Sequence, residues 1–550
     1  LFRSVLAGAV LGFLLFTFTT NLNILIISFI LGALLIVFQF IKLYEKVIFS
    51  LFVLVVSLVF ITFPVDKQLK ESLFINQEIL KLENSVYGEV VKTSHFEQVN
   101  IYENQNLVYS SGMEQKTEEA VHFTLIQHDK PETVLIISPN IAQVMSELSM
   151  YPTLKTVDFL ETNQVLIEHQ NQLLPDTVNF NYRIHQKDAI QYLTHNKLQY
   201  DAIIIQTPPP STLNYNRYYT RNFYRLVMEN LHPSGLMSAS LPASMNYVNP
   251  ALINLTGSIY YTIKQVFKEV LILPGTSLFL LASNARLSNE IITLLESVNM
   301  EADYVNPYYL DAFSMHQQQE QILAEIKDID LLNSLNNPNA FLYNVESWYS
   351  KTGEFNRFIP YLLAVLLIIV VVTVRNLFLV SVFVSGFTVT SIELLVILMF
   401  QMIIGSVYQY ISVIIALFMI GMAMGSFWQQ NRKRGSNIHP LQIIIAVILA
   451  LISVVAKFFL SYQIWHVAVF VLLGMLISVL CGRIFVISAN SIGSINSGAS
   501  KAYGFDLMGA ALGAFAIPVI VVPFFGLIET ILIITALNLG MGIYMTIRKL

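Results

Sequence analysis

Thr133-Val134-Leu135-Ile136-Ile137-Ser138 is the stretch that decides how the middle of this 550-residue chain folds. Short, apolar, β-rich runs of the same kind recur after it and alternate with helical stretches, which predicts a mostly parallel, doubly wound α/β sheet. The expected strands are residues 133–138, 156–161, 178–184, 201–206, 236–241, 269–273 and 278–283. Only Pro274-Gly275-Thr276-Ser277 joins the last two strands, so they must form a hairpin at an antiparallel edge.

A small β-lobe is expected just before this sheet. Residues 87–112 alternate in strand fashion around the polar turn Glu103-Asn104-Gln105-Asn106, which predicts a β-hairpin. The hydrophilic part of the chain then divides into 66–130, a linker with the hairpin lobe, 131–286, a Rossmann-like sheet domain, and 287–357, a helical tail and connector. Ligands of such sheets bind beyond the carboxyl ends of the strands, where the strand order reverses.

The composition excludes a purely soluble protein. The chain is 55% hydrophobic and 12% charged, with a mean hydropathy of +0.61, whereas soluble domains carry about 25% charged residues. A net charge of -5 without a basic stripe excludes nucleic-acid binding. The single cysteine, Cys481, excludes a disulfide framework, and the ten histidines show no ligand spacing, so no metal site is expected.

Two apolar blocks flank the hydrophilic part and predict a multi-pass membrane protein. Runs of about 17–25 apolar residues are long enough to cross a bilayer as helices. Three are expected within 1–65, at 4–20, 22–41 and 47–63, and the first residue, Leu1, suggests that they end a larger helical block. Seven are expected within 358–550, at 358–374, 377–403, 408–428, 441–460, 464–482, 504–524 and 527–546.

The uneven distribution of charge predicts the orientation of the chain. Between Asp66 and Arg357 lie 32 of the 36 acidic residues, and alternation of the helices puts eleven of the twelve flanking bases on one side of the membrane. Only Lys457 falls on the other side. The positive-inside rule makes the base-rich side cytoplasmic. We therefore expect a protein of the bacterial cytoplasmic (inner) membrane whose hydrophilic domain is extracytoplasmic.

Several runs, taken in order, resemble a known family. They are Glu161 at a strand end, Asp188-Ala189, Tyr200–Ile205 (YDAIII), Tyr218–Tyr224 (YYTRNFY), Leu231–Gly235 (LHPSG), Asn333-Ser334 with Pro338 and Trp348, and the apolar runs SIELLVILMFQ, ALFMIGMAMGS and YGFDLMGAALGA. Their order is similar to that of the polyamine aminopropyltransferases, the spermidine and spermine synthases, and in particular of their membrane-fused bacterial relatives. The resemblance implies a methyltransferase-type sheet domain whose cofactor, if the domain is active, is decarboxylated S-adenosylmethionine.

The resemblance assigns roles to two acids and shows three departures from the family. It implies that Glu161 contacts the nucleoside ribose and that Asp188 contacts the adenine. Ser138-Pro139-Asn140-Ile141-Ala142 replaces the family's glycine-rich cofactor loop, and its proline also lacks a backbone donor. Gln206 stands where the family has its catalytic aspartate, and an amide cannot accept a proton from an attacking amine. Of the family's Tyr-His-Glu cluster only His122 remains.

Simpler interpretations stay open for these residues. Glu161 and Asp188 are also explained as solvated or capping acids, and His122 as an ordinary helix residue. The polar residues expected inside the membrane are Glu393, Gln401, Arg483 and Asp506. Asp506 and Arg483 are a candidate ion pair, and such groups either hold helices together or line a transport path.

The function expected from these observations is not enzymatic. We expect a polytopic α-helical membrane protein with an inserted α/β domain that binds no cofactor and acts as a scaffold or ligand-binding subunit. Its expected partners are the lipid bilayer and other membrane or envelope proteins. Two alternatives remain: an active polyamine aminopropyltransferase, and a transporter of polyamines or other small solutes.

Overall fold

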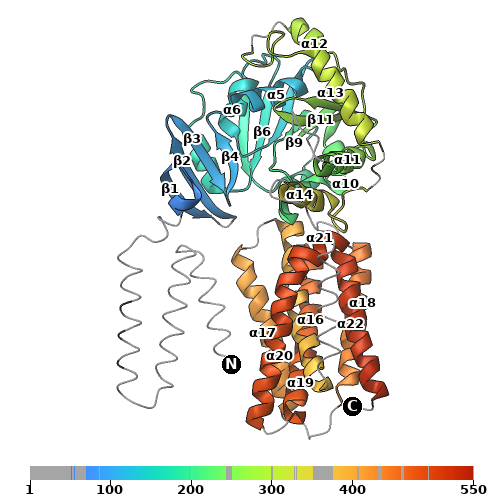
Figure 1. Ribbon diagram of the computed structural model, residues 1–550. Helices are drawn as coiled ribbons and strands as arrows, with labels where there is room; N and C mark the ends of the chain where they lie inside the picture. Colours follow the sequence, from blue (N-terminus) through green and yellow to red (C-terminus); the bar gives the residue numbers. More distant parts are fainter. Residues whose placement is uncertain are drawn as a thin grey trace.

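The structure, a computed structural model, places an α/β domain on one end of a bundle of long helices (Figure 1). It describes residues 47, 51, 55, 70–85, 87–196, 198–242, 250–298, 302–327, 329, 331–350, 376–405, 408–430, 437–459, 464–492 and 495–548. The spans predicted at 4–20, 22–41 and 358–374 therefore lie outside the described residues, and 47–63 is described only at three single positions.

The β-lobe is a four-stranded antiparallel sheet rather than the single hairpin predicted from 87–112. Its strands follow one another in space as in sequence: β1 (Glu78–Ser85), β2 (Gly88–His95), β3 (Gln98–Glu103) and β4 (Asn106–Ser110). The predicted turn after Glu103 joins β3 to β4. The turn between β2 and β3 was missed because it contains Phe96, which adopts a φ of 53° that is unusual for a bulky residue.

The central sheet has the predicted architecture. Its seven strands are β5 (Thr133–Ile137), β6 (Thr156–Glu161), β7 (Asn181–Gln186), β8 (Tyr200–Ile205), β9 (Leu231–Pro242), β10 (Glu269–Pro274) and β11 (Ser277–Ser283), in the order β10-β11-β9-β8-β5-β6-β7. Five strands are parallel, whereas β11 runs antiparallel to both β9 and β10. The strand order reverses between β5 and β8, which is where a ligand site is expected.

Helices cover both faces of this sheet because each buried strand points alternate side chains to opposite faces. Leu135 and Ile137 of β5 pack with α8 (Ala189–His195), α10 (Arg221–Glu229) and α11 (Pro250–Lys264). Val134 and Ile136 pack with α5 (Glu114–Leu125), α6 (Ile141–Leu148) and α12 (Ile291–Val298). The remaining helices of the domain are α7 (Gln164–Asn171), α9 (Leu213–Asn216), the 3-10 turn η1 (Arg217–Tyr219), α13 (Ala312–Glu325) and α14 (Asn339–Ser350).

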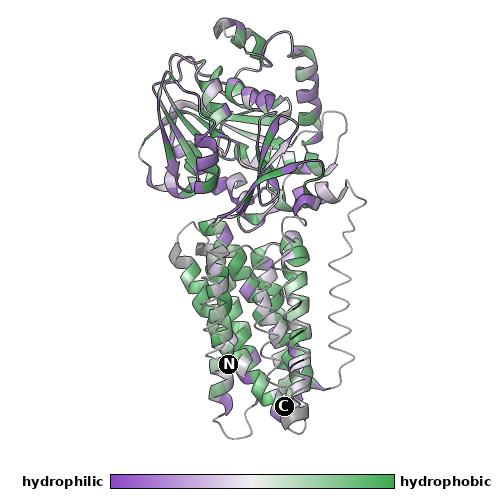
Figure 2. Cartoon of the chain, turned by 90° about the vertical axis from the view of Figure 1, so that its left-hand side faces the viewer, coloured by the Kyte–Doolittle hydropathy of each residue, from purple (hydrophilic) through white to green (hydrophobic). Residues whose placement is uncertain are grey.

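The second apolar block forms long helices whose residues are mainly hydrophobic (Figure 2). They are α16 (Leu377–Ile404), α17 (Tyr408–Gln430), α18 (His439–Phe459), α19 (Ile464–Ser491), α20 (Ile495–Ala516) with its continuation η2 (Ile517–Val521) and α21 (Val522–Phe525), and α22 (Leu527–Ile547). Among the described residues, six helices are long and apolar enough to cross a membrane. The helix predicted at 464–482 is too short, because α19 continues past Arg483 to Ser491.

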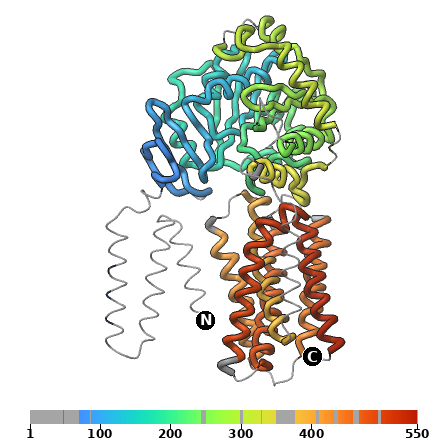
Figure 3. Tube along the Cα trace, in the orientation of Figure 1, coloured from blue at the N-terminus to red at the C-terminus, as the bar shows by residue number. Residues whose placement is uncertain are grey.

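The domain and the bundle meet at the ends of two helices. Leu213 of α9 and Leu335 share one buried cluster with residues of α16. The amide of Leu527, the first residue of α22, donates to the carbonyl of Asn336 at 3.2 Å. Figure 3 shows α16 running toward the domain and α22 running away from it to the C-terminus. The helices between them alternate, so α17 and α19 end far from the domain.

Candidate functional site

A cavity of about 290 Å³ lies at the point where the strand order reverses. It is enclosed by the edge of β4, the start of α5 and the carboxyl ends of β5, β8 and β9. Its lining residues are Asn106, Leu107, Val108, Met113, Lys116, Thr117, Ser138, Pro139, Asn140, Gln206, Thr207, Pro208, Pro209, Ser240, Leu241, Pro242 and Ser277. Gln206 therefore lies in the expected place, whereas Glu161 and Asp188 do not line this cavity.

The side chain of Gln206 is fixed by the neighbouring strand. The hydroxyl of Ser138, which follows β5, donates to Gln206 Oε1 at 2.9 Å, and the backbone amide of Gln206 donates to the carbonyl of Ile137 at 2.9 Å. Ser138 Oγ in turn accepts from the amide of Asn140 at 3.0 Å. The carboxamide oxygen thus accepts one hydrogen bond, and the amino group of Gln206 forms none with a described residue.

Among the described residues that line the cavity, Lys116 is the single charged one. It lies in the first turn of α5, and burial lowers the pKa of its ammonium group. Glu119, one turn further along α5, is committed elsewhere: it accepts from the amide and the hydroxyl of Thr276 at 2.8 and 2.6 Å. Burial raises the pKa of Glu119, and the nearby charge of Glu119 opposes the effect of burial on the pKa of Lys116.

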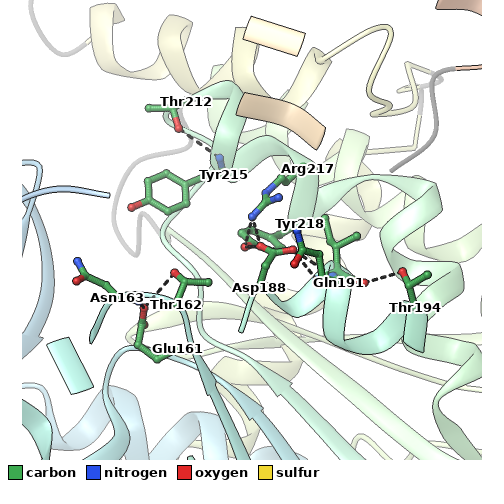
Figure 4. A network of polar contacts seen from close by, with 11 residues as sticks. Glu161, Thr162, Asn163, Asp188, Gln191, Thr194, Thr212, Tyr215, Arg217 and Tyr218 are labelled. Carbon is green, nitrogen blue, oxygen red and sulfur yellow. Dashed lines mark hydrogen bonds and ion pairs between the residues drawn. The ribbon is translucent and has the colours of Figure 1, made fainter. Parts of the chain in front are cut away.

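Glu161 and Asp188 lie near one another beyond the ends of β6 and β7, in a network of polar contacts (Figure 4). Glu161 accepts from the amide of Asn163 at 2.8 Å, and the side chain of Asn163 donates to Glu103 of the lobe at 2.6 Å. Burial and the nearby charge of Glu103 raise the pKa of Glu161 to about 8. The hydroxyl of Tyr215 donates to Glu103 at 3.3 Å, so Glu103 of the lobe links Asn163 to α9.

Both carboxylate oxygens of Asp188 form contacts within the protein. Its Oδ1 atom caps α8, accepting from the amides of Ile190 and Gln191 at 3.1 and 3.2 Å. Its Oδ2 atom accepts from the hydroxyl of Tyr218 at 2.9 Å and forms an ion pair with Arg217. Arg217 is only 2% exposed, and its guanidinium lies 4.7 Å from the centre of the Tyr218 ring. Asp188 thus acts as a helix cap, and a ligand role for it stays a prediction.

Comparison with known proteins gives a family match within this region. Residues 113–283 match the spermine/spermidine synthase domain. The α/β domain that contains this match is called the synthase domain below. The match begins at the start of α5 and ends with the last strand of the central sheet, and it leaves out the lobe and all the membrane helices.

Relatives of the synthase domain are described as polyamine aminopropyltransferases. One from Oceanobacillus iheyensis is 24% identical over 284 residues, which are 49% of this chain and 54% of that protein. The chain thus spans about half the length of that relative. One from Bacillus subtilis (strain 168) is 22% identical over 200 residues, 34% of this chain and 70% of that protein. A spermidine synthase solved with the transition-state analogue AdoDATO is 17% identical, with a TM-score of 0.39 over 46% of this chain and 88% of its own.

His122 lies inside the synthase domain and away from the cavity. Its side chain is fully buried on α5. The two ring nitrogens lie 2.9 Å from the hydroxyl of Tyr151 and 3.1 Å from Glu147 Oε2. Both partners belong to the α6 side of the sheet. This arrangement is that of a hydrogen-bonded core histidine.

The membrane residues singled out in the sequence do not gather into one site. The expected Asp506–Arg483 pair is wrong: Arg483 donates to Gln429 Oε1 at 3.2 Å and lies 5.1 Å from the Trp428 ring. Asp506 instead packs against Gly386 of α16. Glu393 and Gln401 are both on α16, two turns apart, and neither side chain forms a hydrogen bond or ion pair with another described residue.

Four residues of the synthase domain and its lobe were missed by sequence reasoning. They are Glu103, Lys116, Tyr215 and Arg217. Lys116 and Arg217 resemble surface charges on short helices, and no spacing in the sequence relates Glu103 to Tyr215, which are 112 positions apart. Only the fold brings them to the carboxyl edge of the sheet.

Proposed function

We propose that this protein is a membrane-bound relative of the spermidine synthases whose synthase domain binds a ligand or scaffolds a complex instead of transferring aminopropyl groups. One observation carries this proposal: the described residues that line the cavity at the carboxyl ends of β5 and β8 include Gln206 and Lys116 and no acid. Polyamines are cations at neutral pH because alkylamines have pKa values near 10, so Lys116 repels them.

The second half of the site supports the same proposal. Decarboxylated S-adenosylmethionine would have to reach Glu161 and Asp188, and in this structure Asn163, Tyr218 and Arg217 already bond to those carboxylates. Pro139 lacks a donor, and no glycine follows β5 to allow close approach of the backbone. The residues present do not fit this cofactor, so we derive no transfer step.

An activity assay tests this proposal. The purified full-length protein is incubated with putrescine and decarboxylated S-adenosylmethionine, and spermidine is measured by mass spectrometry. We expect none above background, while the Bacillus subtilis aminopropyltransferase serves as the positive control. Gln206→Asp is also expected to be inactive, because Lys116 and the occupied acid network are unchanged. Spermidine formation by the wild-type protein would refute the proposal.

We also propose that the synthase domain is extracytoplasmic. Because α16 ends at the domain, the far side of the bundle receives the end of α17, the start of α20 and the end of α22. The bases near those ends are Arg432-Lys433-Arg434, Lys501 and Arg548, whereas the domain side has Lys457. The positive-inside rule then favours a cytoplasmic far side. The proposal includes binding of other membrane or envelope proteins, because a domain without catalytic activity would act through the molecules that it binds.

Labelling with a membrane-impermeant maleimide tests the orientation. Single cysteines replace exposed Gln317 of α13 and exposed Asn437 before α18, in a background where Cys481→Ser removes the natural thiol. We expect Gln317→Cys to react in intact cells and Asn437→Cys to react only after lysis. Each variant is the matched control for the other, and the reverse pattern would place the domain in the cytosol.

A further inference from the structure

Lys116, Gln206 and Asn140 each bring to the cavity beside Gln206 a polar group without a hydrogen-bond partner among the described residues. Lys116 forms no ion pair or hydrogen bond with any described residue. The amino group of Gln206 likewise has no partner within the described part of the chain, since only its oxygen is bonded, to Ser138. Asn140 Oδ1 is buried without a hydrogen-bond partner among the described residues. These three residues thus provide a cation, a donor and an acceptor.

The free acceptor of Asn140 belongs to a buried side chain, so solvent does not satisfy it. The side chain is 6% exposed, and its Nδ2 atom donates to Thr117 Oγ1 at 3.0 Å and to Gln143 Oε1 at 2.7 Å. These two bonds fix the carboxamide plane and leave Oδ1 without a donor. A buried acceptor without a donor is unfavourable, so a ligand hydroxyl at this position would relieve a cost already present in the ligand-free protein.

Lys116 points to the charge of that ligand. A cation in the first turn of a helix is disfavoured by the helix dipole, and Lys116 occupies the third position of α5. Its neighbour Glu119 acts on it electrostatically but is itself hydrogen-bonded to Thr276 and Gln115. An anion in the cavity would supply a direct partner, which no described residue provides. The volume of about 290 Å³ is at the small end of ligand cavities, so the anion is a small molecule.

We propose that this cavity binds a small hydroxycarboxylate, with its carboxylate against Lys116 and Gln206 Nε2 and its hydroxyl donating to Asn140 Oδ1. This inference rests on the proposed function, because a site that handled polyamines would need the opposite charge. It assigns a ligand class to the domain that the transferase relationship does not imply.

Isothermal titration of the full-length protein in detergent tests this assignment, with L-malate as the probe. Wild type is expected to bind malate saturably, to bind succinate more weakly because succinate lacks the hydroxyl, and not to bind putrescine. Lys116→Gln is expected to weaken malate binding about ten- to a hundredfold, whereas Lys116→Arg retains it. Lys187→Gln removes an equal charge at an exposed position outside the cavity and is the matched control, expected to bind as wild type does.

The outcomes distinguish this inference from the proposed function. Absence of malate binding, equal binding by Lys116→Gln and Lys187→Gln, or binding of putrescine would each overturn the hydroxycarboxylate site. Sulfate binding as tight as malate binding would also overturn it, because sulfate has no hydroxyl for Asn140. The ligand-free Lys116→Gln protein is expected to resist proteolysis as wild type does, since Lys116 has no described partner to lose. Spermidine synthesis, by contrast, would refute the non-enzymatic function itself.

Discussion

Replacing Arg217 with methionine is expected to destabilise the synthase domain by about 3–5 kcal/mol, because it leaves the carboxylate of Asp188 buried without its counter-charge. Pulse proteolysis in urea, performed on the detergent-solubilised protein, measures this loss. Arg221→Met is the matched control, since Arg221 is exposed at the start of α10 and its removal is expected to change stability by less than about 0.5 kcal/mol.

A second substitution separates the loss of charge from the loss of packing. In the double variant Arg217→Met/Asp188→Asn no buried charge lacks a partner, and the asparagine still caps α8. The double variant is therefore expected to be more stable than Arg217→Met alone. If the two were equally unstable, packing of the Arg217 guanidinium against Tyr218 and Gly405 would be the main contribution, and the ion pair would be energetically unimportant.

Replacing Gly425 with leucine is expected to disrupt the bundle. A Cβ atom at Gly425 would overlap the carbonyl oxygen of Val479, so α17 and α19 must separate. Overpacking a close contact costs about 1–3 kcal/mol, and here the obstacle is backbone that cannot change rotamer. The measurement is thermal unfolding followed with a thiol-reactive dye, because Cys481 is buried in the bundle and reacts only when the helices open.

Gly504→Leu is the matched control for this experiment. Gly504 also lies in a membrane helix, α20, but no atom of a described residue lies within 4 Å of a Cβ atom added there. Its substitution is expected to leave the unfolding temperature unchanged or to raise it, since leucine favours helix more than glycine does. Equal unfolding temperatures for the two variants would mean that α17 and α19 do not pack as closely as described.

The sequence predicted the central sheet well because its strands are buried on both faces. Strands such as β5 and β8 are continuous apolar runs bounded by polar turns, and each predicted strand lies within a few residues of an observed one, although β9 begins five residues early, at Leu231. The lobe was harder to predict: β2 and β3 turn at Phe96, a residue that signals no turn. The extent of α19 was missed because Arg483 and Asn490 interrupt the apolar run while the helix continues.

Only part of the candidate site could be predicted from the sequence. Gln206 could be placed because it follows a recognisable strand, and the cavity indeed forms at that strand end. Lys116, in contrast, gives no signal in the sequence, since a lysine at the start of a helix is usually on the surface. It lines the cavity together with β4 of the lobe, and β4 reaches this place through contacts between distant segments, such as the bond from Gln143 Nε2 to the Ser110 carbonyl.

The contact between Arg217 and Gly405 couples the position of α16 in the membrane to the α/β domain. Gly405 ends α16, and the guanidinium of Arg217 packs so closely against it that no side chain could be added there. A helix of 28 residues is about 42 Å long, so α16 is a stiff rod that extends across the bundle from the far side to this contact. Tilting or sliding of that rod would displace Arg217, and through Asp188 it would strain the first turn of α8 inside the synthase domain.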